Sequence, residues 1–213
     1  MIKNIAFSLF TLIFLLIGSA VYAQDDVTEP NRLEHFLDNL ETFSAGFEQI
    51  LSNEFGEEIE TSVGVVYLMT PGKFHWAYYE PYSQFIISNG ITLWIYDEDL
   101  EQVTIRRMSD SIENSPAAVL GGDIDIDAHY VVIDLEAKDG INWLELTPRD
   151  NDSQYDSIRL GFNNENLAEM ILFDNLGQET RIRFLDAKRN LTLDHSLFVF
   201  DPPEGVDVID DRQ

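Results

Sequence analysis

The stretch QFIISNGITLWIYDEDLEQVTIR, residues 84–106, contains three β-strand patterns separated by two turn signals. Asn89-Gly90 is typical of two-residue hairpin loops, and the acidic run 97–100 predicts a second turn. We expect these turns to place Phe85 opposite Trp94, and Trp94 opposite Val103. One face would then carry Phe85, Ile87, Trp94, Tyr96, Val103 and Ile105, and the less apolar face would carry Gln84, Ser88, Gln102 and Thr104 beside Ile86, Leu93 and Ile95.

The same two-residue alternation extends in both directions from this stretch. Thr180, Ile182 and Phe184 alternate with two arginines. Successive hairpins predict a mainly antiparallel, up-and-down sheet with one apolar and one wet face. Further strands are expected at residues 44–52, 64–69, 74–79, 130–135, 143–147, 158–162, 168–173, 180–185 and 197–200.

Two short helices are predicted outside the sheet. Leu33, Phe36, Leu37 and Leu40 recur with helical spacing after Pro30. The second helix should span residues 115–121, from a serine cap to a glycine stop. Two short helices can cover only part of the apolar face of so many strands. Either loops complete an ordinary core, which the pattern alone favours, or part of the apolar face forms a cavity for an apolar ligand.

The first 23 residues have the features of a cleaved signal peptide. Lys3 precedes the apolar run 5–17, which is too short to span a hydrocarbon core of ~30 Å at ~1.5 Å per residue. Val21-Tyr22-Ala23 fits a cleavage site, although an uncleaved anchor stays open. We expect residues 24–213 to form one exported β domain that is soluble after cleavage. The chain contains no cysteine, which excludes disulfides and a lipid anchor on cysteine.

The net charge of the chain is −26 at pH 7. Such a surface repels nucleic acid and anionic lipid headgroups, so we expect no nucleic-acid partner. Two explanations of this acidity are equally good: adaptation to salt, and the steering of a protein partner.

Catalytic and metal-binding motifs are not evident in the sequence. It has no G-x-S-x-G elbow, P-loop or dinucleotide fingerprint, and its four histidines are far apart. The D-x-D-x-D run 123–127 starts like a calcium loop, but Ala128 occupies the position where the turn requires glycine. We therefore predict no catalytic residue, no metal and no cofactor, and a periplasmic hydrolase is the weakest of the alternatives.

Several short motifs, in this order, resemble the outer-membrane lipoprotein carrier proteins of the LolA family. They are TPGKFHW (70–76), SNG (88–90), LWIYD (93–97), LEQV (100–103), SPA (115–117) and FVFDPPEGVDV (198–208). Each motif is weak alone, but the ordered set covers the mature chain. The resemblance implies an unclosed antiparallel β-barrel, or half-barrel, covered by short α-helices.

This resemblance also implies a function and partners. The chain would be a periplasmic chaperone that accepts lipoproteins from an inner-membrane lipoprotein-releasing ABC transporter. It would shield their acyl chains and deliver them to an outer-membrane lipoprotein receptor, with no reaction catalysed. We expect a monomer. The alternative on the same fold is a periplasmic carrier or sensor of another lipid or glycolipid.

Alternation and resemblance together suggest site residues, although core packing is an alternative for each. The expected wall of the acyl-chain cavity is Phe74, Trp76, Tyr78, Phe85, Ile87, Trp94, Tyr96, Val103, Ile182 and Phe184. The expected lid residues are Leu33, Leu37, Leu40, Pro116, Ala117 and Leu120. Relatives commonly carry Arg or Lys before the proline of the aromatic strand as a lid latch. Here that position is Thr70, so either Lys73 replaces the latch or the lid is looser.

Overall fold

The computed structural model describes residues 32–38, 40–108, 119–121, 125–150, 152–164 and 166–212. The predicted signal peptide lies outside these residues, and so do Pro116, Ala117 and the start of the calcium-like run at Asp123. The boundary between residues 23 and 24 therefore stays a prediction.

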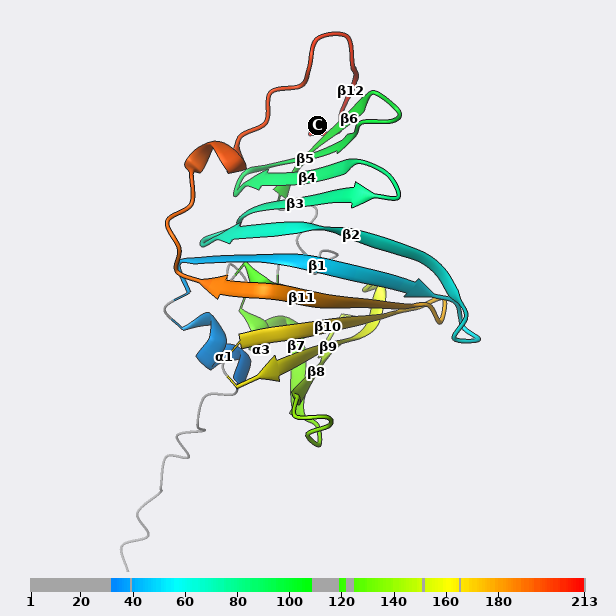
Figure 1. Ribbon diagram of the computed structural model, residues 1–213, viewed down its shortest axis with the longest axis vertical. Coiled ribbons are helices and arrows are strands. Elements are labelled where there is room, and N and C mark those ends of the chain that lie inside the picture. Colours follow the sequence, from blue (N-terminus) through cyan, green and yellow to red (C-terminus); the bar gives the residue numbers. More distant parts are fainter. Residues whose placement is uncertain are drawn as a thin grey trace, which may run out of the picture.

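One sheet of twelve strands forms the body of the molecule (Figure 1). The sheet order is β12-β6-β5-β4-β3-β2-β1-β11-β10-β9-β8-β7. The strands are β1 (Thr42–Ser52), β2 (Glu58–Met69), β3 (Lys73–Glu80), β4 (Gln84–Asn89), β5 (Thr92–Asp97), β6 (Gln102–Arg107), β7 (Tyr130–Asp134), β8 (Asn142–Pro148), β9 (Tyr155–Asn163), β10 (Asn166–Asp174), β11 (Glu179–Arg189) and β12 (Asp207–Asp210).

Two antiparallel meanders, β1–β6 and β7–β11, are joined where β1 pairs with β11. The sheet stays open, because β12 and β7 are its two edges. The prediction of an unclosed, mainly antiparallel sheet with few short helices is confirmed. The exception is β12, which pairs with β6 in parallel and was not predicted.

The first predicted helix is shorter than its pattern suggests, because α1 (Arg32–Leu37) ends before Leu40. α3 (Ile126–His129) precedes β7 and was not predicted. The second predicted helix, residues 115–121, lies mostly outside the described residues, of which Val119 and Leu120 are helical.

The predicted strand at 197–200 is wrong, because this segment contains the 3-10 helix η3 (His195–Phe198), capped by the Asp194 carboxylate. Its alternating apolar residues suggested a strand, but the segment packs Phe198 as an isolated turn rather than pairing with a neighbour.

The first hairpin has the predicted faces but a different register. Phe85 lies opposite Tyr96, and Trp94 lies opposite Ile105 rather than Val103. Asn89 accepts backbone hydrogen bonds from Ile91 and Thr92 through Oδ1, and this centres the turn one residue later than predicted. A shift of two residues in the pairing keeps every side chain on its predicted face.

The structure reverses the interpretation of these two faces. We call the face that carries the main buried cluster, including Phe74 and Trp76, the inner face. Trp76 lies opposite Ile86, so the inner face of β4 carries Ile86 and not its neighbours in sequence. The prediction that the more apolar face lines the cavity is therefore wrong for Phe85, Ile87, Trp94, Tyr96 and Val103, which lie on the outer face.

The C-terminal segment explains why this outer face is apolar. Phe200 contacts the ring of Tyr96 at 5.4 Å between centroids, and His75 Nδ1 lies 2.8 Å from the carbonyl oxygen of Leu197. Figure 1 shows η3 beside the β3–β5 hairpins. The segment thus covers apolar side chains of the outer face. The strand pattern alone could not predict this contact.

α1 packs on the inner face. The ring of Phe36 lies 6.0 Å from that of Phe43 in β1 and 5.6 Å from that of Phe162 in β9. One side chain therefore touches both meanders, on either side of the β1–β11 junction. Within the described ranges, no helix is long and apolar enough to cross a membrane.

Candidate functional site

The centre of the inner face is a cluster of aromatic side chains from three strands. The Phe47 ring lies 5.2 Å from that of Trp76 and 5.1 Å from that of Tyr78. Phe184 contacts both Trp76 and Phe43. Of the ten predicted wall residues, the inner face brings together Phe74, Trp76, Tyr78, Ile182 and Phe184.

Phe43 and Phe47 complete this wall and were missing from the predicted site. Both are fully buried, and they lie opposite Leu68 and Gly64 of β2. Their spacing with Ala45 on β1 is the two-residue signal that could have identified them.

The apolar part of the inner face is covered. Leu33 and Phe36 of α1 are buried, Leu37 is partly buried against the cluster, and Leu40 follows the helix into the core. Leu120 is also buried. These buried side chains fill the apolar part of the inner face in this structure.

Arg189 of β11 holds the end of α1. Its Nη2 atom donates hydrogen bonds to the carbonyl oxygens of Phe36 at 2.7 Å and Asp38 at 3.3 Å. Its guanidinium carbon also lies 5.0 Å from the centroid of the Phe36 ring. Sequence reasoning missed this contact because 153 residues separate the two partners.

The two predicted latch residues have different positions. Thr70 donates from Oγ1 to the carbonyl oxygen of Leu40 at 2.6 Å, so it contacts the segment that follows α1. Lys73 lies on β3 one residue before Phe74, and its side chain therefore belongs to the outer face. Of the two alternatives for the latch, the one with Lys73 is not supported by this position, because α1 packs on the opposite face of the sheet.

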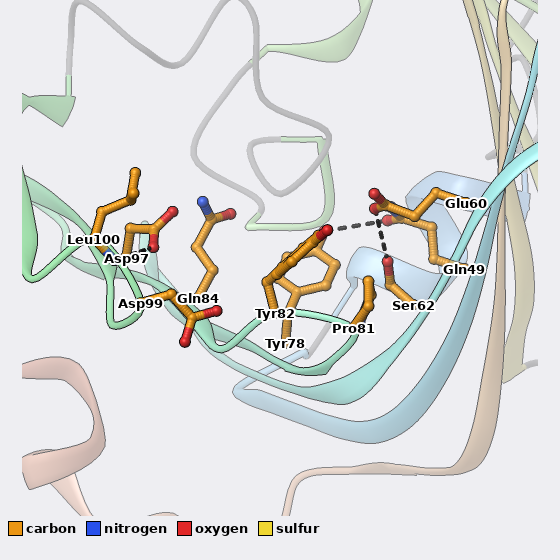
Figure 2. Close-up of a pocket in the computed structure, with 10 residues that line it drawn as sticks. All are labelled: Gln49, Glu60, Ser62, Tyr78, Pro81, Tyr82, Gln84, Asp97, Asp99 and Leu100. Atoms are coloured by element: carbon orange, nitrogen blue, oxygen red, sulfur yellow. Dashed lines mark hydrogen bonds between the residues drawn. The ribbon is translucent and has the colours of Figure 1, made fainter.

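A pocket of about 450 Å³, lined by polar residues together with Tyr78, Pro81, Tyr82 and Leu100, opens at the other end of the inner face. Tyr78 lies at its centre and donates to Gln49 Oε1 at 3.1 Å, while Ser62 donates to Glu60 (Figure 2). Burial raises the pKa of the Tyr78 hydroxyl well above its usual range. Its lining residues are Gln49, Glu60, Ser62, Tyr78, Pro81, Tyr82, Gln84, Asp97, Asp99 and Leu100.

The inner face therefore changes from apolar to polar along its strands. On β1 the sequence runs from Phe43 and Phe47 to Gln49, and on β3 it runs from Phe74 and Trp76 to Tyr78. Such a surface suits a ligand with apolar tails and a polar end. No group of three or more potential metal ligands occurs among the residues that the structure describes.

A family model described as "Outer membrane lipoprotein carrier protein LolA" matches residues 38–201. The chain belongs to the LolA family. It is 39% identical over 190 residues to the outer-membrane lipoprotein carrier protein of Methylococcus capsulatus, covering 89% of this chain and 91% of that protein. The protein of the same name from Chromobacterium violaceum is 38% identical over 203 residues, covering 95% and 97% of the two chains.

The fold of this LolA-family chain also occurs in a solved structure. An uncharacterized conserved protein from Thermus thermophilus superposes with a TM-score of 0.52 at 13% identity, covering 84% of this chain and 94% of that protein. At this identity the likeness concerns the fold alone. The predicted family and fold class are both confirmed.

Proposed function

We propose that this protein carries lipoproteins across the periplasm by binding their acyl chains against the inner face. The observation that carries the proposal is membership of the LolA family together with an inner face that is apolar at one end and polar at the other. The activity is non-covalent and requires no cofactor. The chain reaches the periplasm through the predicted signal peptide and works there as a monomer.

The energetics of lipid burial explain why such a carrier is needed. Burying ten CH₂ groups contributes about 8 kcal/mol, so acylated lipoproteins do not cross water unaided. The wall of Phe47, Trp76 and Phe184 provides a large apolar area on stiff side chains. Rigid aromatic rings offer this area without the close interdigitation of branched aliphatic side chains, which favours release.

Loading requires α1 to move. Leu33 and Phe36 are buried in the closed arrangement, and exposing such side chains costs about 1.5–3 kcal/mol each. Burial of one acyl chain contributes more than the exposure of Leu33 and Phe36 costs. Binding of cargo therefore offsets the cost of moving α1 away from the inner face. α1, the segment around Leu40 and the buried Leu120 therefore form a lid, with Arg189 rather than Lys73 as its cationic contact.

Two membrane partners follow from this role. An inner-membrane ABC transporter would load the carrier, and an outer-membrane receptor would unload it. The carrier's affinity for acyl chains then lies between the affinities of these two partners, since each transfer must run downhill. The acidic surface keeps the carrier away from anionic headgroups between the two encounters.

A release assay tests the proposal directly. Spheroplasts that contain a labelled lipoprotein are incubated with the purified protein, and the supernatant is analysed for a soluble complex of the two. We expect a complex with the unmodified protein and reduced loading or handover with Trp76→Leu. Trp94→Leu is the matched control, because Trp94 lies on the outer face.

Two results would contradict the proposal. Loading and handover that are unchanged in Trp76→Leu would remove the inner aromatic wall from the mechanism. Absence of any soluble complex, combined with a different lipid or glycolipid co-purifying with the protein, would favour the alternative carrier or sensor role.

A further inference from the structure

Trp76 contains a buried polar group without a partner. Its side chain is 5% exposed, and its Nε1 atom forms no hydrogen bond within the described part of the chain. A buried N–H group without an acceptor is costly, and folded proteins rarely retain one. The protein therefore keeps a donor without a well-formed hydrogen bond where the apolar part of the inner face ends, beside Tyr78.

This donor lies on the side of Trp76 that leads to the polar pocket. Tyr78, two residues further along the same face of β3, lines that pocket. Burial raises the pKa of the Tyr78 hydroxyl, and the nearby indole N–H of Trp76 opposes this effect. The two groups are close, but they do not meet hydrogen-bond geometry, and the Tyr78 hydroxyl donates to Gln49 instead.

Trp76 also marks the boundary between the two halves of the inner face. On its α1 side lie Phe74 and Leu68, which are buried, and on its other side lies the pocket. An acyl group has its only polar atoms at one end, where the carbonyl joins the chain to its glycerol or amine. A chain lying under α1 would bring that carbonyl to the level of Trp76.

We propose that the indole N–H of Trp76 donates a hydrogen bond to an acyl carbonyl of the cargo. This inference rests on the proposed function and adds an orientation to it. The hydrocarbon tails lie toward α1, the ester or amide carbonyl lies at Trp76, and the polar remainder of the cargo leaves through the pocket around Tyr78. Cargo thus supplies the acceptor that the closed protein lacks.

Replacing the carbonyl in the ligand tests this assignment. Binding is compared for a diacylglyceryl lipopeptide and its dialkyl ether analogue, which has the same chains but no ester carbonyl. Competition against a fluorescent lipopeptide measures both dissociation constants. We expect the unmodified protein to bind the ester roughly threefold to tenfold more tightly than the ether.

Two variants identify the donor. Trp76→Phe keeps an aromatic ring but removes the N–H group, and it should bind both analogues equally. Trp94→Phe on the outer face should keep the preference of the unmodified protein. If Trp76→Phe does not fold, the comparison of the two ligands on the unmodified protein still tests whether the carbonyl is recognised, and equal affinities would overturn the inference.

The possible outcomes separate the inference from the function. Equal affinity of the unmodified protein for ester and ether would overturn the inference and leave the carrier function intact. Failure to bind either lipopeptide would overturn the carrier function and the inference with it. A preference for the ester that persists in Trp76→Phe would also overturn the assignment to Trp76.

The predicted orientation has an independent readout. A photoreactive residue at Tyr82, an exposed rim residue of the pocket, should cross-link to the polypeptide of a bound lipoprotein. The same residue at Val199, exposed in the C-terminal segment, should not. Cross-linking at Val199 and not at Tyr82 would overturn the proposed exit route.

Discussion

The guanidinium of Arg189 donates a hydrogen bond of 2.7 Å to the carbonyl oxygen of Phe36, in the last turn of α1. The final carbonyls of a helix have no partner within the helix, and a cation at this end is favourable. Arg189 is the last residue of β11, a central strand of the sheet. The position of α1 is therefore tied to the most extensively paired part of the molecule.

Arg189→Gln should loosen α1 without unfolding the sheet. Charge-assisted hydrogen bonds contribute about 1.5–3 kcal/mol, so hydrogen exchange of the α1 amides should accelerate about tenfold to a hundredfold. Arg189→Lys should give an intermediate result, because it keeps the charge but loses the planar fork over Phe36. Mass-spectrometric exchange of peptides covering residues 33–38 measures the effect.

Arg183→Gln is the control for this experiment. Arg183 is exposed on the outer face, where it pairs with Glu48 and Glu169. Exchange in α1 should not change in this variant. An exchange rate that is equally unchanged in Arg189→Gln would show that Arg189 does not restrain the lid.

Phe198→Ala should destabilise the whole domain. Phe198 in η3 is fully buried, and removing a buried phenylalanine typically costs about 3–5 kcal/mol. Urea unfolding followed by tryptophan fluorescence measures the change. The neighbouring Val199 is 59% exposed, so Val199→Ala should change the unfolding free energy by less than about 0.5 kcal/mol. Equal effects of the two variants would mean that the C-terminal segment does not form part of the core.

Glycine usually weakens the interior of a strand, but replacing this one should not help: Gly64→Ala should be strongly destabilising. A Cβ atom at Gly64 would lie 1.9 Å from the carbonyl oxygen of Ala77 and 2.7 Å from the Phe47 ring. Backbone must shift to relieve this overlap, so we expect a loss of about 3 kcal/mol or more in the free energy of unfolding.

Gly46→Ala on the adjacent strand is the matched control. There a Cβ atom would meet only ordinary contacts, the nearest at 3.7 Å from Leu185 Cβ. Urea unfolding of both variants should separate them clearly. A Gly64→Ala protein as stable as Gly46→Ala would contradict the close approach of β2, β3 and Phe47.

Stability should decrease at alkaline pH in a way that depends on Tyr78. Burial raises the pKa of this hydroxyl above its value of about 10 in the unfolded chain. Its contribution is therefore complete below about pH 10 and is lost as the pH rises toward the folded-state pKa.

Tyr78→Phe removes this titration, so its stability should fall less steeply above pH 10 than that of the unmodified protein. Urea midpoints at pH 8 and pH 11 for both proteins measure the difference. The burial of Tyr155 also raises a tyrosine pKa, so part of the dependence should persist in the variant. Identical slopes in the two proteins would contradict a buried Tyr78 hydroxyl.

Local alternation was sufficient for much of the fold. The period of two at Thr180, Ile182 and Phe184 placed these residues on one face, and the Asn89-Gly90 pair located the first hairpin. Both signals depend only on residues close in sequence, since a strand turns successive side chains to opposite faces. The resemblance to LolA proteins then supplied the open sheet and its helical cover.

The sequence by itself determined most of the strands, the composition of each face and the family, but not β12 or the helical turn η3. It could not determine which face of β4–β6 is the inner one, because apolar alternation is the same whether α1 or the C-terminal segment covers it. The tertiary structure decided that choice. It also decided the contact of Arg189 with Phe36 and the position of the unpartnered indole of Trp76. Each depends on residues that are distant in the chain and meet only after β1 pairs with β11 and η3 folds back over the sheet.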